Sequence, residues 1–270
     1  MQLAYTPPGQ RDHFVESLIT TVCLWGCRLA RNATLSTFES ALLARAVHLL
    51  SGSLFLANTE ARGHGIIGVI QAEVLLSNYF FSLGRFLEGR YHCSAAASLA
   101  ISCQLNVLGG EPNPRTQRGL AMDLVASQDL GLASVGSADP VQTGERINAF
   151  WTVYILDKLW AGALSAPSSI TDQVPGGMPL STPWGLSMEM YEQVCLRDLR
   201  CRAYEISYYA QQGHVPPRDP NHSPLQAFLR APSSPNDLAG NTALTLRAKA
   251  STLFSRASNL ASQYQEGVYV

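Results

Sequence analysis

The chain has 270 residues, of which 46% are hydrophobic and only 14% are charged, a composition typical of a globular protein with a sizeable buried core. Its 19 lysines and arginines nearly balance its 20 aspartates and glutamates, so the formal net charge is −1. A nearly neutral chain without a dense basic run has no field that attracts nucleic acid or an acidic membrane surface. We therefore expect neither as a direct partner.

Two helices are predicted near the start of the chain. Apolar residues recur at about every fourth position, which predicts one buried stripe on a first helix. Ser36 and Glu39 stand three positions apart in the order of a capping box, so a second helix is expected to begin there and to end near Gly52. The predicted stripe on the first helix consists of Phe14, Leu18, Val22, Trp25 and Leu29.

A third and a fourth helix are expected before residue 110. The stretch 64–83 is apolar enough to raise the question of a membrane span, but Glu73 lies in its middle, and a charge there favours a buried helix of a globular protein. The next helix, expected at about 85–108, is rich in small side chains that let another helix approach closely. These small residues are Ala95, Ala96, Ala97 and Ala100.

The second half of the chain alternates predicted helices with proline-rich segments. Asp139 and Pro140 supply an N-cap and a first-turn proline for a helix. Two further helices are expected near 187–212 and 243–264, and the proline-rich segment 213–240 is typical of an exposed connection.

No convincing strand pair and no repeat of fixed length interrupts this helical pattern. The predicted fold class is therefore all-α: a single multi-helix domain of packed antiparallel helices with long Pro-rich loops. We expect an N-terminal helix and lead-in at 1–34 and the main domain at 35–270.

Motifs for metal, nucleotide or catalytic chemistry are weak. Gly63, Gly65 and Gly68 have dinucleotide-loop spacing, but no strand leads into them, so a helix is the better interpretation. No nucleophile elbow, zinc-protease motif or phosphate-binding loop is found. We expect no catalytic residue, no cofactor-binding residue and no metal ligand in this chain. Its six cysteines, at 23, 27, 93, 103, 195 and 201, lack the paired spacing of a zinc site.

The most specific stretch is 144–170, an aromatic helix followed by a turn. Asp157 lies among apolar neighbours, and a buried carboxylate needs hydrogen-bond donors. The turn 165–170 carries free amides and hydroxyls that could supply them, so we predict that Asp157 holds this turn. The alternative is a solvated Asp157 beside Lys158. The apolar face of the helix is expected to contain Ile147, Phe150, Trp151, Tyr154, Ile155 and, as an extension, Leu159.

The ordered residues of this stretch resemble those of the fungal-specific transcription factor domain, the middle homology region found downstream of a binuclear zinc cluster. The resemblance extends over about 35–264. This sequence departs from the family at Ile147 and Asn148, where arginines are common, and at Ser165 and Ala166, which replace a Gly-Arg pair. The family-motif residues, for which the resemblance implies a structural role, are Glu145, Arg146, Phe150, Trp151, Tyr154, Asp157, Lys158, Pro167, Ile170 and Asp172.

The resemblance implies a non-catalytic regulatory domain of a nuclear transcription factor, which acts through ligand or partner binding. Transcriptional co-regulators or a small effector are the implied partners. DNA and zinc are implied only for a separate N-terminal module, because that module needs six closely spaced cysteines. Family members usually continue further, so we also expect truncation at the C-terminus.

Other interpretations stay open at this stage. The chain could be a helical protein-interaction scaffold, or an all-α enzyme acting on an apolar small molecule. A homodimer is compatible with each of these functions.

Overall fold

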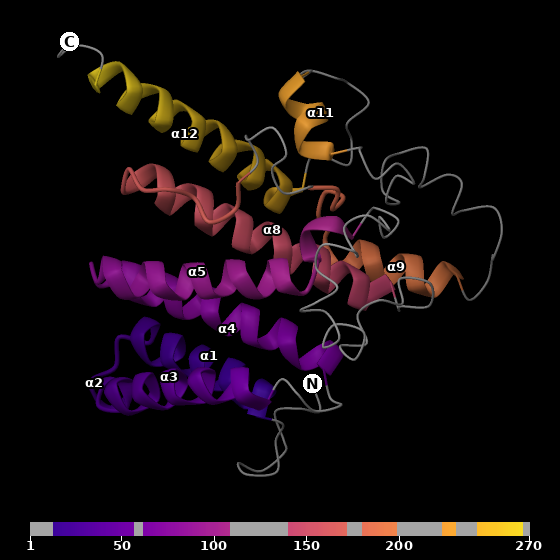
Figure 1. Cartoon of the computed structure of the whole chain (residues 1–270). Helices are drawn as coiled ribbons and strands as arrows, with labels where there is room; N and C mark the ends of the chain where they lie inside the picture. The colour runs from indigo at the N-terminus through magenta and orange to yellow at the C-terminus, as the bar shows by residue number, and fades with distance from the viewer. Residues whose placement is uncertain are drawn as a thin grey trace. The chain divides into compact units, whose positions relative to one another are not determined.

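The computed structural model describes residues 13–56, 62–108, 140–171, 180–198, 223–230 and 242–266. Within these ranges the regular secondary structure is helical and contains no strand, which confirms the all-α prediction (Figure 1). The contacts divide the chain into two compact units. The described residues up to Ala96 belong to the first unit, and those from Ala97 onward belong to the second.

The first unit is built around α1, which packs against both α3 and α4. The helix α5 begins in this unit and continues into the second one. The helices of the first unit are α1 (His13–Leu29), α2 (Ala33–Ser36), α3 (Glu39–Leu56), α4 (Arg62–Ser82) and the first part of α5 (Phe86–Ser102).

The second unit is built around α8, which packs against α9 and α12. Asn148, Tyr154 and Gly162 of α8 lie close to progressively later residues of α12, so these two helices run in the same direction. The predicted fold was one of packed antiparallel helices, and this pair is instead parallel. The helices that begin in this unit are η2 (Leu105–Val107), α8 (Pro140–Ala163), α9 (Met188–Asp198), α11 (Pro224–Arg230) and α12 (Ala243–Glu266).

The buried face of α1 differs from the predicted stripe. Val22 and Leu29 are 52% and 70% exposed, so the stripe was wrong at both positions. Hydroxyl residues are buried on α1 instead. Ser17 Oγ donates to the carbonyl of Phe14 at 2.7 Å, and Thr21 Oγ1 donates to that of Ser17 at 2.8 Å. A hydroxyl satisfied by its own helix can be buried without an outside partner. The buried residues of α1 are Phe14, Ser17, Thr20, Thr21 and Leu24.

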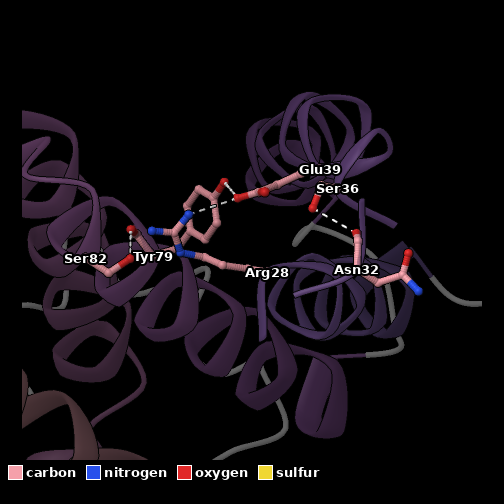
Figure 2. A network of polar contacts seen from close by, with 6 residues as sticks. All are labelled: Arg28, Asn32, Ser36, Glu39, Tyr79 and Ser82. Carbon is pink, nitrogen blue, oxygen red and sulfur yellow. Dashed lines mark hydrogen bonds and ion pairs between the residues drawn. The ribbon is translucent and has the colours of Figure 1, made fainter. Parts of the chain in front are cut away.

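The start of α3 also differs from the capping-box prediction. Asn32 caps the short α2 by accepting a bond from Thr34 N at 2.8 Å, while α3 begins only at Glu39. The Glu39 carboxylate instead accepts hydrogen bonds from Tyr79 Oη at 2.6 Å and from Arg28 Nη1 at 3.2 Å, as Figure 2 shows. Burial and the hydrogen bond to Glu39 raise the pKa of Tyr79 to about 12. Glu39 thus connects three helices and does not cap its own.

The helices α4 and α5 form a tight antiparallel pair. Ser77 Oγ donates to the carbonyl of Gly89 at 2.7 Å, and Glu73 Oε2 lies 2.6 Å from His92 Nδ1. The stretch Gly65–Ser82 is long and apolar enough to span a membrane by length and composition, yet 67% of it is buried within the structure. Glu73 is buried with His92 as its partner, which is the paired state that a charge in an apolar interior requires.

The close contact between α4 and α5 predicts that substitution of Gly89 is destabilising, and Gly26 of α1 serves as the comparison. A Cβ on Gly89 would lie 2.6 Å from the buried Phe81 ring, whereas a Cβ on Gly26 would meet nothing within 4 Å. Gly89→Ala should therefore lower the free energy of unfolding by about 1–3 kcal/mol through overpacking. The matched variant Gly26→Ala should raise it by up to about 1 kcal/mol through helix propensity. Urea denaturation followed by helical circular dichroism measures both, and equal effects would contradict the close approach.

Candidate functional site

The candidate site is the aromatic helix α8 and the turn that follows it. Phe150, Trp151 and Tyr154 are almost completely buried, as their place on the predicted apolar face required. Leu159 is 41% exposed, so the predicted extension of that face was wrong. Burial instead continues around the helix, because neighbouring elements contact it on several sides. The other buried apolar residues of α8 are Ile147, Ala149, Val153, Leu156 and Ala161.

The carboxylate of Asp157 is buried and is bonded to the turn. It accepts hydrogen bonds from Ser169 N at 2.9 Å, from Ile170 N at 3.1 Å and from Ser168 Oγ. The Asp157 residue is only 4% exposed, so these donors replace the water that the carboxylate loses. The hydrogen bonds expected between Asp157 and the turn are therefore present.

Lys158 binds the same turn as a hydrogen-bond donor, whereas Asp157 binds it as an acceptor. Its Nζ donates to the carbonyl of Ile170 at 2.7 Å and lies 5.3 Å from the centroid of the Tyr154 ring. Asp157 thus binds amide groups of the turn while Lys158 binds a carbonyl group. Both side chains are buried, so the alternative of a solvated Asp157 beside Lys158 is wrong.

The aromatic residues of α8 make polar contacts as well as apolar ones. Trp151 Nε1 donates to the carbonyl of Pro183 at 2.6 Å, and its ring lies 4.5 Å from that of Trp184. Tyr154 Oη lies 3.0 Å from Thr252 Oγ1 of α12. A buried indole and a buried phenol therefore both have hydrogen-bond partners, and each one joins α8 to a distant part of the chain.

The segment 180–186 is a loop that lies entirely in the interior of the second unit. Its polar groups are paired, since Ser181 N donates to the carbonyl of Asn106 at 2.9 Å and Thr182 Oγ1 donates to that of Leu105. Sequence reasoning missed the burial of this segment. The apolar residues Leu180, Trp184 and Leu186, spaced between polar ones, were the available signal.

The first turns of α8 pack closely against α9. A Cβ on Gly144 would lie 2.3 Å from the ring of Tyr191, so only glycine permits this contact without displacement. Burial raises the pKa of Tyr191 to about 12, while its hydroxyl accepts a bond from Leu186 N at 3.3 Å. Burial likewise raises the pKa of Cys103 to about 11, and nearby Arg146 opposes this shift.

The remaining motif residues do not converge on one point. Glu145 and Pro167 are exposed, Arg146 is half-buried, and Asp172 lies outside the described residues. The motif therefore consists of a buried group around Asp157 and Lys158, together with more peripheral residues at the head of α8 and in the turn. These two charged groups are engaged with the turn, so the contacts that they make in the structure hold its backbone.

The cysteines whose side chains the structure describes do not gather into a zinc cluster. Cys23 is exposed and Cys27 is half-buried on α1. Cys93 and Cys103 are buried elsewhere, and all four are free thiols. Across the described part of the chain, no three His, Cys, Asp or Glu side chains gather as metal ligands. A zinc site requires four converging ligands.

Fold and site together define an all-α domain organised around an aromatic helix whose buried Asp157 and Lys158 hold the turn that follows it. The sequence profile of the fungal specific transcription factor domain matches residues 3–176, which is more than half of the chain. The chain therefore belongs to the fungal-specific transcription factor domain family, and the resemblance found in its sequence is confirmed. No curated protein and no solved structure matches it.

Substitution of Asp157 tests its contribution to stability. In Asp157→Asn the side chain loses its charge, and one of its oxygens becomes an NH₂ group that opposes the donors of the turn. The free energy of unfolding should fall by about 2–4 kcal/mol, because buried donors are left unpaired. Glu192→Gln removes an exposed carboxylate of α9 and is the control, with an expected change below about 0.5 kcal/mol. An unchanged urea midpoint for Asp157→Asn would contradict the proposed hold on the turn.

The raised pKa of Tyr191 predicts that the free energy of unfolding falls at alkaline pH. Its pKa rises from 10.0 to about 12 on folding, so the folded state binds the proton more tightly. This contribution is complete below pH 10 and disappears as the pH rises towards 12, a loss of about 2–3 kcal/mol. Tyr191→Phe keeps the ring and removes the ionisable group. Urea midpoints measured across this pH range should fall less steeply for the variant than for the parent chain, and equal slopes would refute the assignment.

Proposed function

We propose that this chain is a non-catalytic regulatory domain of a nuclear zinc-cluster transcription factor, which controls transcription by binding a ligand or a protein partner. The observation that carries the proposal is the family membership of residues 3–176 together with the buried hold of Asp157 on the turn. Asp157 and Lys158 are engaged with the backbone and support a structural role, in agreement with a regulatory function.

Sequence-specific DNA recognition would come from a zinc cluster outside these residues. The near-neutral charge of the chain supports this division, because non-specific DNA affinity depends on cationic contacts to phosphates. Among the described free cysteines, Cys23 and Cys27 lie on α1, whereas Cys93 and Cys103 lie in α5 and directly after it. Regulation would then depend on the helical surfaces of this chain and on the ligand or protein partner that binds them.

A tethering experiment tests the regulatory role. The chain is fused to an unrelated DNA-binding domain, and transcription from a reporter with the matching DNA site is measured in a fungal host. We expect the fusion to change reporter output about fivefold or more relative to the DNA-binding domain alone, in line with ordinary regulatory coupling energies. The same fusion with Asp157→Asn should lose most of this effect at equal protein level, because its turn is no longer held.

The Glu192→Gln fusion is the matched control and should behave like the parent. A fusion that leaves the reporter unchanged, although the protein is folded and nuclear, would count against the proposed function. Turnover of a small apolar metabolite by the purified chain, abolished by a single carboxylate substitution, would favour an enzyme.

A further inference from the structure

The helix α12 presents its most apolar side to solvent. The side that packs into the second unit consists of small residues, most of them with hydroxyl groups: Thr245, Ala248, Ser251, Thr252 and Ser255. The opposite side carries an exposed set of larger apolar residues and alanines, which we call the heptad face. The heptad face consists of Leu246, Ala250, Leu253, Ala257, Leu260 and Tyr264.

The spacing of the heptad face is that of a helix–helix seam. Its leucines recur every seven residues, with alanines or a tyrosine four residues after each. At about 100° per residue, all six side chains fall within an arc of about 80°. Leucines at this repeat, with small residues between them, form the knobs and holes of a coiled coil. The exposed fractions of Leu246, Leu253 and Leu260 are 51%, 52% and 60%.

The charges beside the heptad face are all positive. Arg247 and Arg256 flank it on opposite sides, and α12 contains no acidic residue before Glu266. Neither arginine makes an ion pair with another described residue. Arg256 Nε is buried and, within the part of the chain that the structure describes, lacks a hydrogen-bond acceptor. Both flanks of the seam therefore carry guanidinium groups that would accept a carboxylate partner.

A second copy of α12 would be a poor occupant of this face. Its own flanks carry the same cations, so pairing two copies would bring positive groups to the seam with no acid to neutralise them. A helix with an apolar stripe and flanking glutamates or aspartates satisfies both the leucines and the arginines.

We propose that the heptad face of α12 is a docking site for an amphipathic helix of acidic character, which would be the protein partner through which this domain regulates transcription. The inference rests on the proposed function for its biological setting, but the binding itself is independent of any reporter. The partner helix would place apolar residues at heptad spacing against Leu246, Leu253 and Leu260. Its acidic flanks would pair with Arg247 and Arg256.

Binding is tested with a synthetic helical peptide of three heptads that carries leucine at each a and d position and glutamate at each e and g position. The control peptide carries lysine in place of glutamate. Titration of the fluorescently labelled peptides with the whole chain should show binding of the acidic peptide only, weakening as salt concentration rises. Leu253→Glu should weaken binding at least about tenfold. Leu87→Glu, the same change at an exposed leucine of α5, should leave it unchanged.

Charge reversal supplies a second variant that keeps the leucines intact. Arg247→Glu should weaken the acidic peptide and improve the lysine peptide, while circular dichroism shows an unchanged fold. Equal binding of both peptides, no binding of either, or no effect of Leu253→Glu would overturn the proposal. Self-association of the chain without peptide, abolished by Leu253→Glu, would assign the face to a second copy and would also overturn it. A silent reporter fusion beside intact peptide binding would instead reject the proposed function alone.

Discussion

The second unit depends on the burial of one carboxylate. An unpaired ion in an apolar interior costs several kcal/mol, so Asp157 can be buried only where the chain returns donors to it. The turn after α8 supplies two amides and a hydroxyl, and Lys158 fixes the carbonyl side of the same turn. Once the turn is held, the chain direction after α8 is determined. The aromatic face of α8 contacts the loop 180–186 and α12.

Close packing in both units depends on positions where a side chain is missing. Gly65 accommodates the Phe14 ring, Gly89 accommodates that of Phe81, and Gly144 accommodates that of Tyr191. In each case an aromatic ring from one helix occupies the space that a Cβ on the other would need. These contacts specify which helix faces meet, because shifting either helix by one residue would place a side chain against the ring.

The helical class, the family and the hold of Asp157 could be predicted from sequence because each depends on local pattern. Periodicity identifies helices, and a lone acid within an aromatic helix requires nearby donors. The buried face of α1 could not be predicted, because Ser17 and Thr21 satisfy their hydroxyls within the helix and so behave as small apolar residues. The burial of the loop 180–186 depends on carbonyls of Leu105 and Asn106, far away in the chain. Such pairing follows from tertiary structure, and the apolar residues Leu180, Trp184 and Leu186 do not reveal these partners by themselves.

The two lysines of this chain provide a chemical readout for the turn after α8. Lys158 and Lys249 carry its only side-chain amines. The first is enclosed beneath the turn, and the second lies about 5 Å from the rings of Trp184 and Phe228. Acylation of an amine requires an unprotonated, accessible nitrogen, so the folded chain offers reagents and lysine-modifying enzymes very few targets. The rate at which Lys158 becomes acylated would therefore measure how often the turn opens. An ordinary amine reagent would thus report the rate of local unfolding at this site.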